Sequence, residues 1–426
     1  MVQQRITFAG SVSRSFAEGS ELLGQLADLA VSAKQVERVC RRIGGERVAQ
    51  RNAEVAAFVA LPLVEKFQTP AGVEAPDLAV VMADGGRLQI RDRATRSAAA
   101  PPPVAADEAA TSPTATADEM WEEEKTPPGH WREDKVGLLL TMKSAVSATD
   151  PCPQLPDAFV DAARIPKLVR ELSRQLKRPE EATEAAVAAE PAEPAPALAA
   201  AYQPPQVLQR RVLASRQRWP SLAPILAAAA WAWGLQGAAR KAFVGDGSAN
   251  HWRLQRRFFG SFVPILDFIH ALSYVYAAAT AGRSRALGWS CYREWIGWVW
   301  QGQVCRVIAA LRDRQSELGL PEPGEPETSP RPVVARTLTY LNNQQDKMRY
   351  DEYRRQGLPI TSSLIESVVK QVNRRVKGTE KFWSEEGAEA LLQLRADYLS
   401  DGQPLEAFWQ RRQETATGQR RYRPAA

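Results

Sequence analysis

The stretch Lys241-Ala-Phe-Val-Gly-Asp246-Gly-Ser248 and the following Ile265-Leu-Asp267-Phe-Ile-His270 decide the predicted fold. Each contains a short apolar run that ends in an aspartate, and a basic and aromatic segment, 250–259, separates the two. Short apolar runs bounded by turn residues are typical of buried strands, whereas a longer mixed segment favours a helix. The pattern therefore predicts a strand–helix–strand–helix unit in which Asp246 and Asp267 follow the two strands.

An earlier region adds further strands to this unit. Leu78-Ala-Val-Val-Met-Ala83 is a continuous apolar run, as in a strand covered on both faces. We interpret Asp84-Gly85-Gly86 as a tight turn, because Asp and Gly tolerate positive φ, and the alternating segment 87–92 as the next strand. Lys135-Val-Gly-Leu-Leu-Leu-Thr-Met142 completes an antiparallel meander of three strands. Together these elements predict an α/β fold with a mixed sheet flanked by helices.

The N-terminal part, 16–66, shows the apolar spacing of helices. Ser32 and Gln35 match a capping box that opens a helix over about 33–43, and Gly44-Gly45 is expected to end it. Three short helices with a basic middle one suit either a DNA-binding helix-turn-helix unit or a small bundle with a solvated charged face. The candidate DNA contacts of this region are Arg38, Arg41 and Arg42.

The long segment 271–358 is predicted to be helical throughout, and helices are also expected over 157–177 and 206–240. Trp295 and Trp298 are spaced for one face of a helix. This spacing favours core packing of the segment over a platform on which bases stack.

A further amphipathic helix begins near Thr361 and carries Glu366 in its first turn. Opposite its apolar face, cations recur at helical steps from the glutamate: Lys370, Arg374 and Lys377. A carboxylate followed by a cationic stripe suits a site where a metal ion lies beside a nucleic-acid backbone. These three cations are therefore candidate DNA contacts.

The composition of the chain narrows the possible chemistry. The 426 residues carry a formal net charge of +6, a modest lean toward acidic partners such as nucleic acid. No CxxC pair occurs among the four cysteines, and three histidines give little support to a multi-histidine zinc site or a Ser-His-Asp mechanism. Carboxylates are therefore the expected metal ligands, and they favour Mg²⁺ or Mn²⁺. Without a signal-peptide core or an apolar membrane-length segment, the expected location is cytoplasmic, with nucleoid association if DNA is bound.

Each candidate carboxylate also has a purely structural explanation. Asp84 and Asp246 both precede glycine and suit turns. Asp267 precedes a helix and suits an N-cap, whereas Glu366 matches a capping box with Ser363. Their order carries more weight, because Asp84, Asp246 and Glu366 converge on one sheet edge if the first and fourth strands are neighbours. Three carboxylates there would hold two metal ions about 3.5–4 Å apart.

The chain resembles bacterial insertion-sequence transposases of the DDE class and is most similar to their ISKra-type branch, which is related to Mutator-like transposases. The resemblance covers about residues 20–410. It rests on segments that occur in the family's order: Val80-Val-Met-Ala-Asp84-Gly, Trp131-Arg-Glu-Asp-Lys-Val-Gly137, Val244-Gly-Asp246-Gly, Ile265-Leu-Asp267-Phe-Ile-His270, Gly357-Leu-Pro-Ile-Thr-Ser-Ser-Leu-Ile-Glu366-Ser and the run 377–395.

This resemblance implies a ribonuclease H-like catalytic fold in which Asp84, Asp246 and Glu366 are the catalytic and metal-binding residues. Two Mg²⁺ or Mn²⁺ ions would assist DNA cleavage at the element ends and strand transfer. The resemblance also implies supporting roles for Asp267 and His270, double-stranded DNA as a partner, and a homodimer or larger synaptic complex. Two alternatives stay open: a transposase-derived DNA-binding protein without catalysis, and a ribonuclease H-like nuclease.

The predicted division of the chain follows from these segments. Its parts are an N-terminal helical, DNA-binding region at 1–75, the first part of the catalytic core at 76–275 with low-complexity inserts at 94–129 and 179–205, a helical insertion at 276–358, the second part of the core at 359–410, and a basic tail at 411–426.

Overall fold

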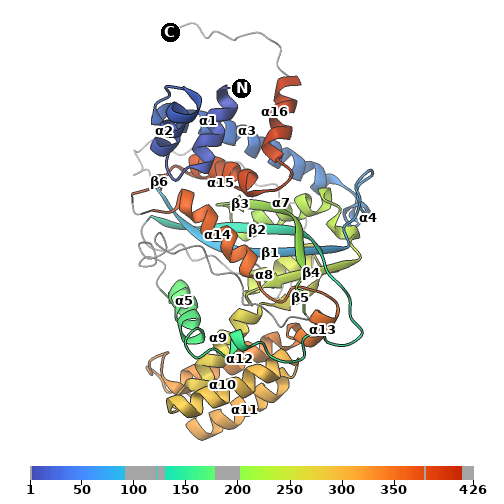
Figure 1. The fold of residues 1–426 in the computed structure, drawn as a ribbon, viewed down its shortest axis with the longest axis vertical. Coiled ribbons are helices and arrows are strands. Elements are labelled where there is room, and N and C mark those ends of the chain that lie inside the picture. The colour runs from blue at the N-terminus through green and yellow to red at the C-terminus, as the bar shows by residue number, and fades with distance from the viewer. Residues whose placement is uncertain (1, 92–120, 122–129, 178–201, 379, 415–426) are drawn as a thin grey trace, which may run out of the picture.

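The computed structural model describes residues 2–91, 121, 130–177, 202–378 and 380–414. Within these residues the chain forms one mixed, open β-sheet with helices on both faces (Figure 1). The predicted α/β class and the mixed sheet are confirmed at this level. The predicted inserts and the end of the basic tail lie largely outside the described residues.

The described part of the sheet runs in the order β3-β2-β1-β4-β5, and β6 also pairs with β1. The strands are β1 (Leu78–Ile90), β2 (Trp131–Lys143), β3 (Gln206–Ser215), β4 (Arg240–Gly245), β5 (Val263–Leu266) and β6 (Phe382–Trp383). β2 is antiparallel to β1 and to β3. β4 and β6 pair with β1 in parallel, and β5 pairs with β4 in parallel.

On the edge of β1 that faces β4, part of the strand is not paired with another described strand, and we call this part the opening of β1. On its other edge β1 pairs with β2 from Leu78 to Gln89. On the β4 edge, 78–82 pair with 240–244, and 89–90 pair with β6. Residues 83–88 therefore have no described strand partner on this edge, and the opening lies beside the point where β4 ends.

The predicted turn at Asp84-Gly85-Gly86 was wrong, because β1 continues through these residues. Gly85 pairs with Lys135 and Gly86 with Asp134 across the ladder to β2. A Cβ on Gly85 would lie 2.6 Å from Glu133 Oε1, and one on Gly86 would lie 2.7 Å from Asp134 Oδ2. The two glycines therefore make room for carboxylates of the neighbouring strand instead of turning the chain.

The observed antiparallel meander consists of β1, β2 and β3. The sequence analysis had placed the residues of β3 in a predicted helix over 206–240. β3 begins with four exposed residues, 206–209, and becomes buried only from Val212 onward. A strand whose first half lies in solvent at the edge of a sheet lacks the apolar run that marks a buried strand. This explains why its sequence did not predict it.

Helices cover both faces of the sheet (Figure 1). α14 (Ser363–Val376) packs against β1 and β2, whereas α7 (Trp219–Ala232) packs on the opposite face next to α8 (Ala249–Phe258). A Cβ on Gly86 would lie 3.0 Å from Asn373 of α14, and one on Gly137 of β2 would overlap Leu226 of α7. The predicted apolar face of α14 is confirmed, since its members are all buried: Ile365, Val368, Val369, Val372 and Val376.

The N-terminal helices pack on the C-terminal ones. They are α1 (Val2–Val12), α2 (Phe16–Ala27), α3 (Ala33–Ala60) and α4 (Leu63–Lys66), and the C-terminal ones are α15 (Glu385–Leu399) and α16 (Pro404–Glu414). The predicted capping box of Ser32 and Gln35 is confirmed. The predicted helix end at Gly44-Gly45 was wrong: a Cβ on Gly44 would lie 2.4 Å from the Ala390 carbonyl oxygen, so this glycine permits close packing of α3 on α15.

The segment 271–358 is helical apart from its connections, as predicted. Its helices α9–α12 gather at the end of the molecule opposite α1–α3 (Figure 1). Trp295 is buried in this region, which confirms core packing for that side chain. The remaining elements are α5 (Ile165–Lys177), α9 (Phe268–Thr280), α10 (Arg285–Trp300), α11 (Val304–Leu318), α12 (Pro330–Gln344), α13 (Tyr350–Arg355) and the 3-10 turns η2 (Asp157–Phe159), η3 (Leu235–Gly237) and η4 (Gln345–Lys347). No helix among the described residues is both long and apolar enough to cross a membrane.

Candidate active site

Three aspartates lie in a row across neighbouring strands. Met82 of β1 pairs with Val244 of β4, so Asp84 and Asp246, each two residues farther on, are at the same level. Gly245 pairs with Leu266 of β5, so Asp246 and Asp267 directly follow paired strand ends. Parallel strands lie about 4.8 Å apart, and their carboxyl ends form one edge. The sheet register therefore brings the three carboxylates to one level, where β4 and β5 end beside the opening of β1.

Asp84 is half-buried in the opening of β1. Its Oδ1 accepts a hydrogen bond of 2.7 Å from the Gly85 backbone N–H. Burial and the neighbouring Asp246 carboxylate raise the pKa of Asp84 to about 6. A cation bound beside Asp84 would favour its ionised form and would offset the repulsion from Asp246.

Asp246 lies in the turn after β4, as its structural explanation predicted. Its Oδ1 accepts a hydrogen bond of 2.9 Å from Ser248 N–H, and Gly247 has a φ of +100°. His251 of α8 is buried, and its Nδ1 lies 2.7 Å from Asp246 Oδ1. Burial acts to raise the pKa of Asp246, but His251 outweighs it, and the pKa falls below its usual range. The turn and the histidine therefore hold this carboxylate ionised.

The sequence analysis did not single out His251. It lies five residues after Asp246, at the start of α8, and this strand–turn–helix geometry folds the ring back onto the carboxylate. Burial acts to lower the pKa of His251, but Asp246 outweighs it and the pKa rises. A histidine that opens a helix directly after a strand-end aspartate is the local signal that could have revealed it.

Two residues of α12 also hold the Asp246 turn, and no local signal predicted them. Tyr340 donates a hydrogen bond of 2.8 Å from its hydroxyl to the Asp246 carbonyl oxygen. Gln344, one helical turn farther on, donates from Nε2 to the Gly247 carbonyl oxygen at 3.1 Å. The helical region between the second aspartate and the glutamate is thereby connected directly to the site.

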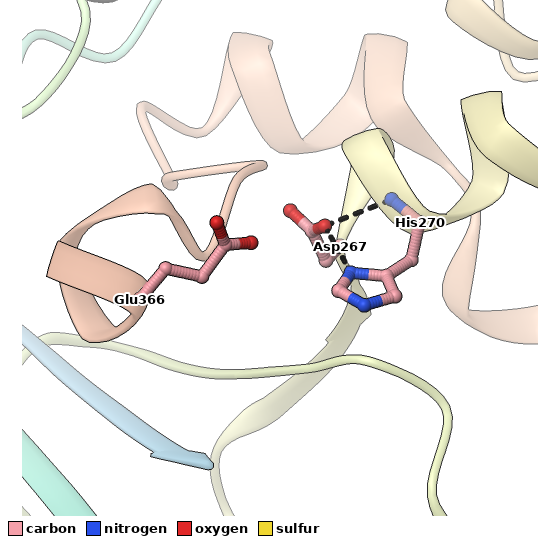
Figure 2. Close-up of side chains that lie close together, drawn as sticks. All are labelled: Asp267, His270 and Glu366. Atoms are coloured by element: carbon pink, nitrogen blue, oxygen red, sulfur yellow. Dashed lines mark hydrogen bonds and ion pairs between the residues drawn. The ribbon is translucent and has the colours of Figure 1, made fainter. Parts of the chain in front are cut away.

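Asp267 is fully buried and joins three chain segments. It caps α9, where Oδ2 accepts from His270 N–H at 2.9 Å, and the same oxygen lies 2.7 Å from His270 Nδ1 (Figure 2). Oδ1 accepts from the Ser362 backbone N–H at 2.7 Å, at the start of α14. The N-cap explanation is therefore confirmed, and the same carboxylate also fixes the entry to α14.

His270 is protonated at neutral pH in this environment. Burial acts to lower the pKa of His270, but the bond to Asp267 outweighs it and raises the pKa to about 9. The imidazolium therefore lies as a fixed positive charge among the carboxylates.

Glu366 projects from the first turn of α14, and Figure 2 shows its carboxylate directed toward Asp267. The predicted capping box was wrong, because Ser363 is the first residue of the helix and the N-cap residue, Ser362, makes no side-chain cap. The free carboxylate instead forms, with Asp267 and His270, a group of three potential ligand atoms within 4.8 Å of one another.

Burial and the Asp267 carboxylate raise the pKa of Glu366 to about 7, and Asp84 acts in the same direction. Glu366 is thus within electrostatic reach of both ends of the aspartate row. The structure brings Asp84 next to Asp246, and Glu366 next to Asp267 and His270. Asp84 and Asp246 are not members of the described group within 4.8 Å.

The predicted DNA contacts fall into two places. Lys370 and Arg374 are exposed on α14 and continue the helix face of Glu366. Lys377 follows the helix end, half-buried, with Nζ 5.8 Å from the centre of the Trp131 ring. The second set, exposed on α3 beside α15, is Arg38, Arg41 and Arg42.

A further carboxylate, Asp134, lies near the site on the strand that pairs with β1. Asp134 of β2 is fully buried, and neither of its oxygens has a hydrogen-bond partner among the described residues. Burial raises the pKa of Asp134 to about 7. The Asn373 side-chain oxygen, also without a described partner, faces the same glycine, Gly86. The sequence analysis quoted Asp134 within a segment but assigned it no role.

No family model matches this chain, and a search of curated proteins found no match. The functional assignment therefore depends on the site geometry and on the sequence segments.

Proposed function

We propose that the chain is a metal-dependent DNA transposase of the DDE class, with Asp84, Asp246 and Glu366 as its catalytic carboxylates. The observation that carries the proposal is the row of aspartates where β4 and β5 end beside β1, with Glu366 directed from α14 toward it. The strand order, in which the central β1 carries the first aspartate, is compatible with a ribonuclease H-like fold. The resemblance of the sequence segments names the class.

The residues present fit divalent cations. The donors are carboxylate oxygens, which Mg²⁺ and Mn²⁺ prefer over softer ligands. Burial and neighbouring carboxylates raise the pKa values of Asp84 and Glu366, and a cation bound between such groups offsets that repulsion. Asp84 and Asp246 would hold one ion, and Asp84 and Glu366 would hold the other.

When bound, the ions would supply activation of the attacking hydroxyl and stabilisation of the leaving 3′-oxygen. The chain itself supplies orientation. Ser248 and His251 hold Asp246 in one rotamer, and Asp267 fixes the start of α14 and hence the direction of Glu366. His270, charged and beside Glu366, is placed to orient that carboxylate or to neutralise a phosphate oxygen.

The Asp246→Asn variant tests the proposal. Cleavage and strand transfer on DNA that carries the flanking element ends should fall to background in Mg²⁺ or Mn²⁺, because the amide is a poor ligand. DNA binding, measured without divalent cations, should stay nearly unchanged. Asp313→Asn, an exposed position on α11, is the matched control and should cleave normally. Unchanged cleavage by Asp246→Asn would contradict the assignment.

The same assay separates the alternatives. A wild-type chain that binds the ends but cleaves nothing in either metal would be a DNA-binding protein without catalysis. A chain that cuts the RNA strand of RNA–DNA hybrids in preference to element ends would be a ribonuclease H-like nuclease. The contact of α12 with the Asp246 turn favours transposition, because it makes the helical insertion part of the site.

A further inference from the structure

A hollow of about 630 Å³ lies between α3 and the first turns of α15, and no residue of the carboxylate row lines it. Arg38, Arg41 and Arg42 line it from α3, and Arg216, which follows β3, lines it from the sheet. We call it the α3–α15 groove. Its glutamates come from α15: Glu385, Glu386 and Glu389.

The uncompensated charge in the groove is positive. Glu389 accepts hydrogen bonds from Ser215 Oγ at 2.8 Å and Arg216 N–H at 2.9 Å, and it also pairs with Arg51. Glu385 pairs with the Arg216 guanidinium. Among the lining acidic residues, Glu386 alone has no described partner.

The three arginines of α3 are all exposed, and none has a described hydrogen-bond or ion-pair partner. Three unpaired cations therefore face one unpaired carboxylate. Residues three and four apart are neighbours on a helix surface, so the three guanidinium groups lie on one side of α3. Positions 38 and 42 are about 6 Å apart along the axis, roughly the axial rise of two nucleotides in one DNA strand.

Arg41 lies beside the start of α15, whose first turn also carries Glu385 and Glu386. Ser384 caps the helix by accepting from Gly387 N–H at 3.1 Å, and Arg41 Cδ lies 4.0 Å from the position of a Cβ on Gly387. A helix N-terminus carries a partial positive charge that favours anions. Arg41 and the N-terminal end of α15 thus border the same part of the groove.

The sheet register relates the position of the groove along the strands to that of the site. Ser215 of β3 pairs with Lys135 of β2, which pairs with Gly85 of β1. Arg216 directly follows Ser215, so its backbone lies about 10 Å across the sheet from β1, at the spacing of two strands. A duplex that reaches the carboxylates extends 3.4 Å per base pair and can reach the groove with nearby phosphates.

We propose that the α3–α15 groove binds backbone phosphates of double-stranded DNA outside the catalytic site, through Arg38, Arg41 and Arg42. The inference rests on the proposed function only in taking DNA as the ligand. Exposed arginines on the side of a helix packed against its own core contact phosphates without reading base edges, so the groove positions the duplex. This differs from a recognition helix inserted into the major groove.

The test uses the full chain and fluorescent duplexes of two unrelated sequences, in EDTA, with the dissociation constant measured over a range of salt. Replacing Arg38, Arg41 and Arg42 together by Gln should weaken binding to both sequences equally. The slope of log affinity against log salt should fall by about 0.9 for each phosphate that the variant no longer neutralises, hence by up to about 3. Lys34→Gln is the matched control, because Lys34 is exposed on the same helix but pairs with Glu37 at 2.7 Å.

A second variant is expected to change the DNA affinity in the opposite direction. Glu386→Gln removes the unpaired carboxylate and should tighten binding several-fold, which misfolding cannot produce. An unchanged slope in the triple variant, or a weakening confined to one sequence, would overturn the proposal. Because no cleavage is measured, this result is independent of Asp246→Asn: a chain that cleaves nothing can still show the slope change, and an active transposase can lack it.

Discussion

Asp267 and Asp134 are both fully buried aspartates near the site, yet their surroundings are opposite. Asp267 accepts hydrogen bonds from two backbone N–H groups and contacts the His270 ring. Asp134 has no described partner for either oxygen. A buried carboxylate stabilises the fold only where donors replace the lost water, and otherwise it shifts its pKa and becomes protonated. We infer that Asp267 connects chain segments and stabilises the fold, whereas Asp134 lowers the stability of the fold at high pH.

The largest change in the free energy of unfolding is expected from Asp267→Asn. An amide cannot accept from two N–H groups and remain paired with a charged imidazole, so buried donors and His270 lose their partner. The free energy of unfolding should fall by about 3–5 kcal/mol, the usual effect of breaking a buried pair. Urea denaturation measures it, with Asp346→Asn as an exposed control on η4 that should change by less than about 0.5 kcal/mol. A small decrease would mean that Asp267 is no connector.

Asp134→Asn is expected to increase the stability of the fold instead of lowering it. The folded pKa of about 7 lies above the ordinary value of 3.8, so the folded state binds the proton more tightly. The stability that this proton contributes is complete at low pH and is lost as pH rises from about 4 to about 7. The amide of the variant has no proton to lose in this range, so the stability of the variant does not fall as pH rises. The variant should therefore be more stable than the wild type by roughly 2–4 kcal/mol at about pH 8, with little difference at about pH 4.

Denaturation at the two pH values measures this difference, and Asp313→Asn is the control. Parallel pH profiles of wild type and Asp134→Asn would show that Asp134 is ionised in the folded state. The contrast with Asp267 would then disappear.

A smaller change in the free energy of unfolding is expected from Gly86→Ala. The added methyl would lie 2.7 and 2.8 Å from the two Asp134 oxygens and 3.0 Å from the Asn373 side-chain oxygen. Overpacking should destabilise by about 1–2 kcal/mol after the gain from replacing glycine in a strand. Gly45→Ala on α3, where a Cβ meets nothing within 4 Å, is the control and should stabilise by up to about 1 kcal/mol. An equal gain at both positions would show that the space beside Asp134 is loosely packed.

Local patterns predicted much of the molecule. The capping box at Ser32, β4, β5 and the apolar face of α14 all follow from hydrogen-bonding and burial patterns that repeat within a few residues. Asp267 was correctly expected to cap a helix for the same reason. Such signals are readable because the interacting groups are close along the chain.

The sequence by itself determined the α/β class, the order of the carboxylates and the helix that presents Glu366. Tertiary structure alone decided that Asp84 lies within a continuous strand, because glycines there admit carboxylates from β2. It also decided that Asp267 reaches Ser362 across 95 residues and that Gly44 joins two helices. These outcomes depend on contacts between segments far apart in the chain, and a local sequence pattern does not specify such a distant partner.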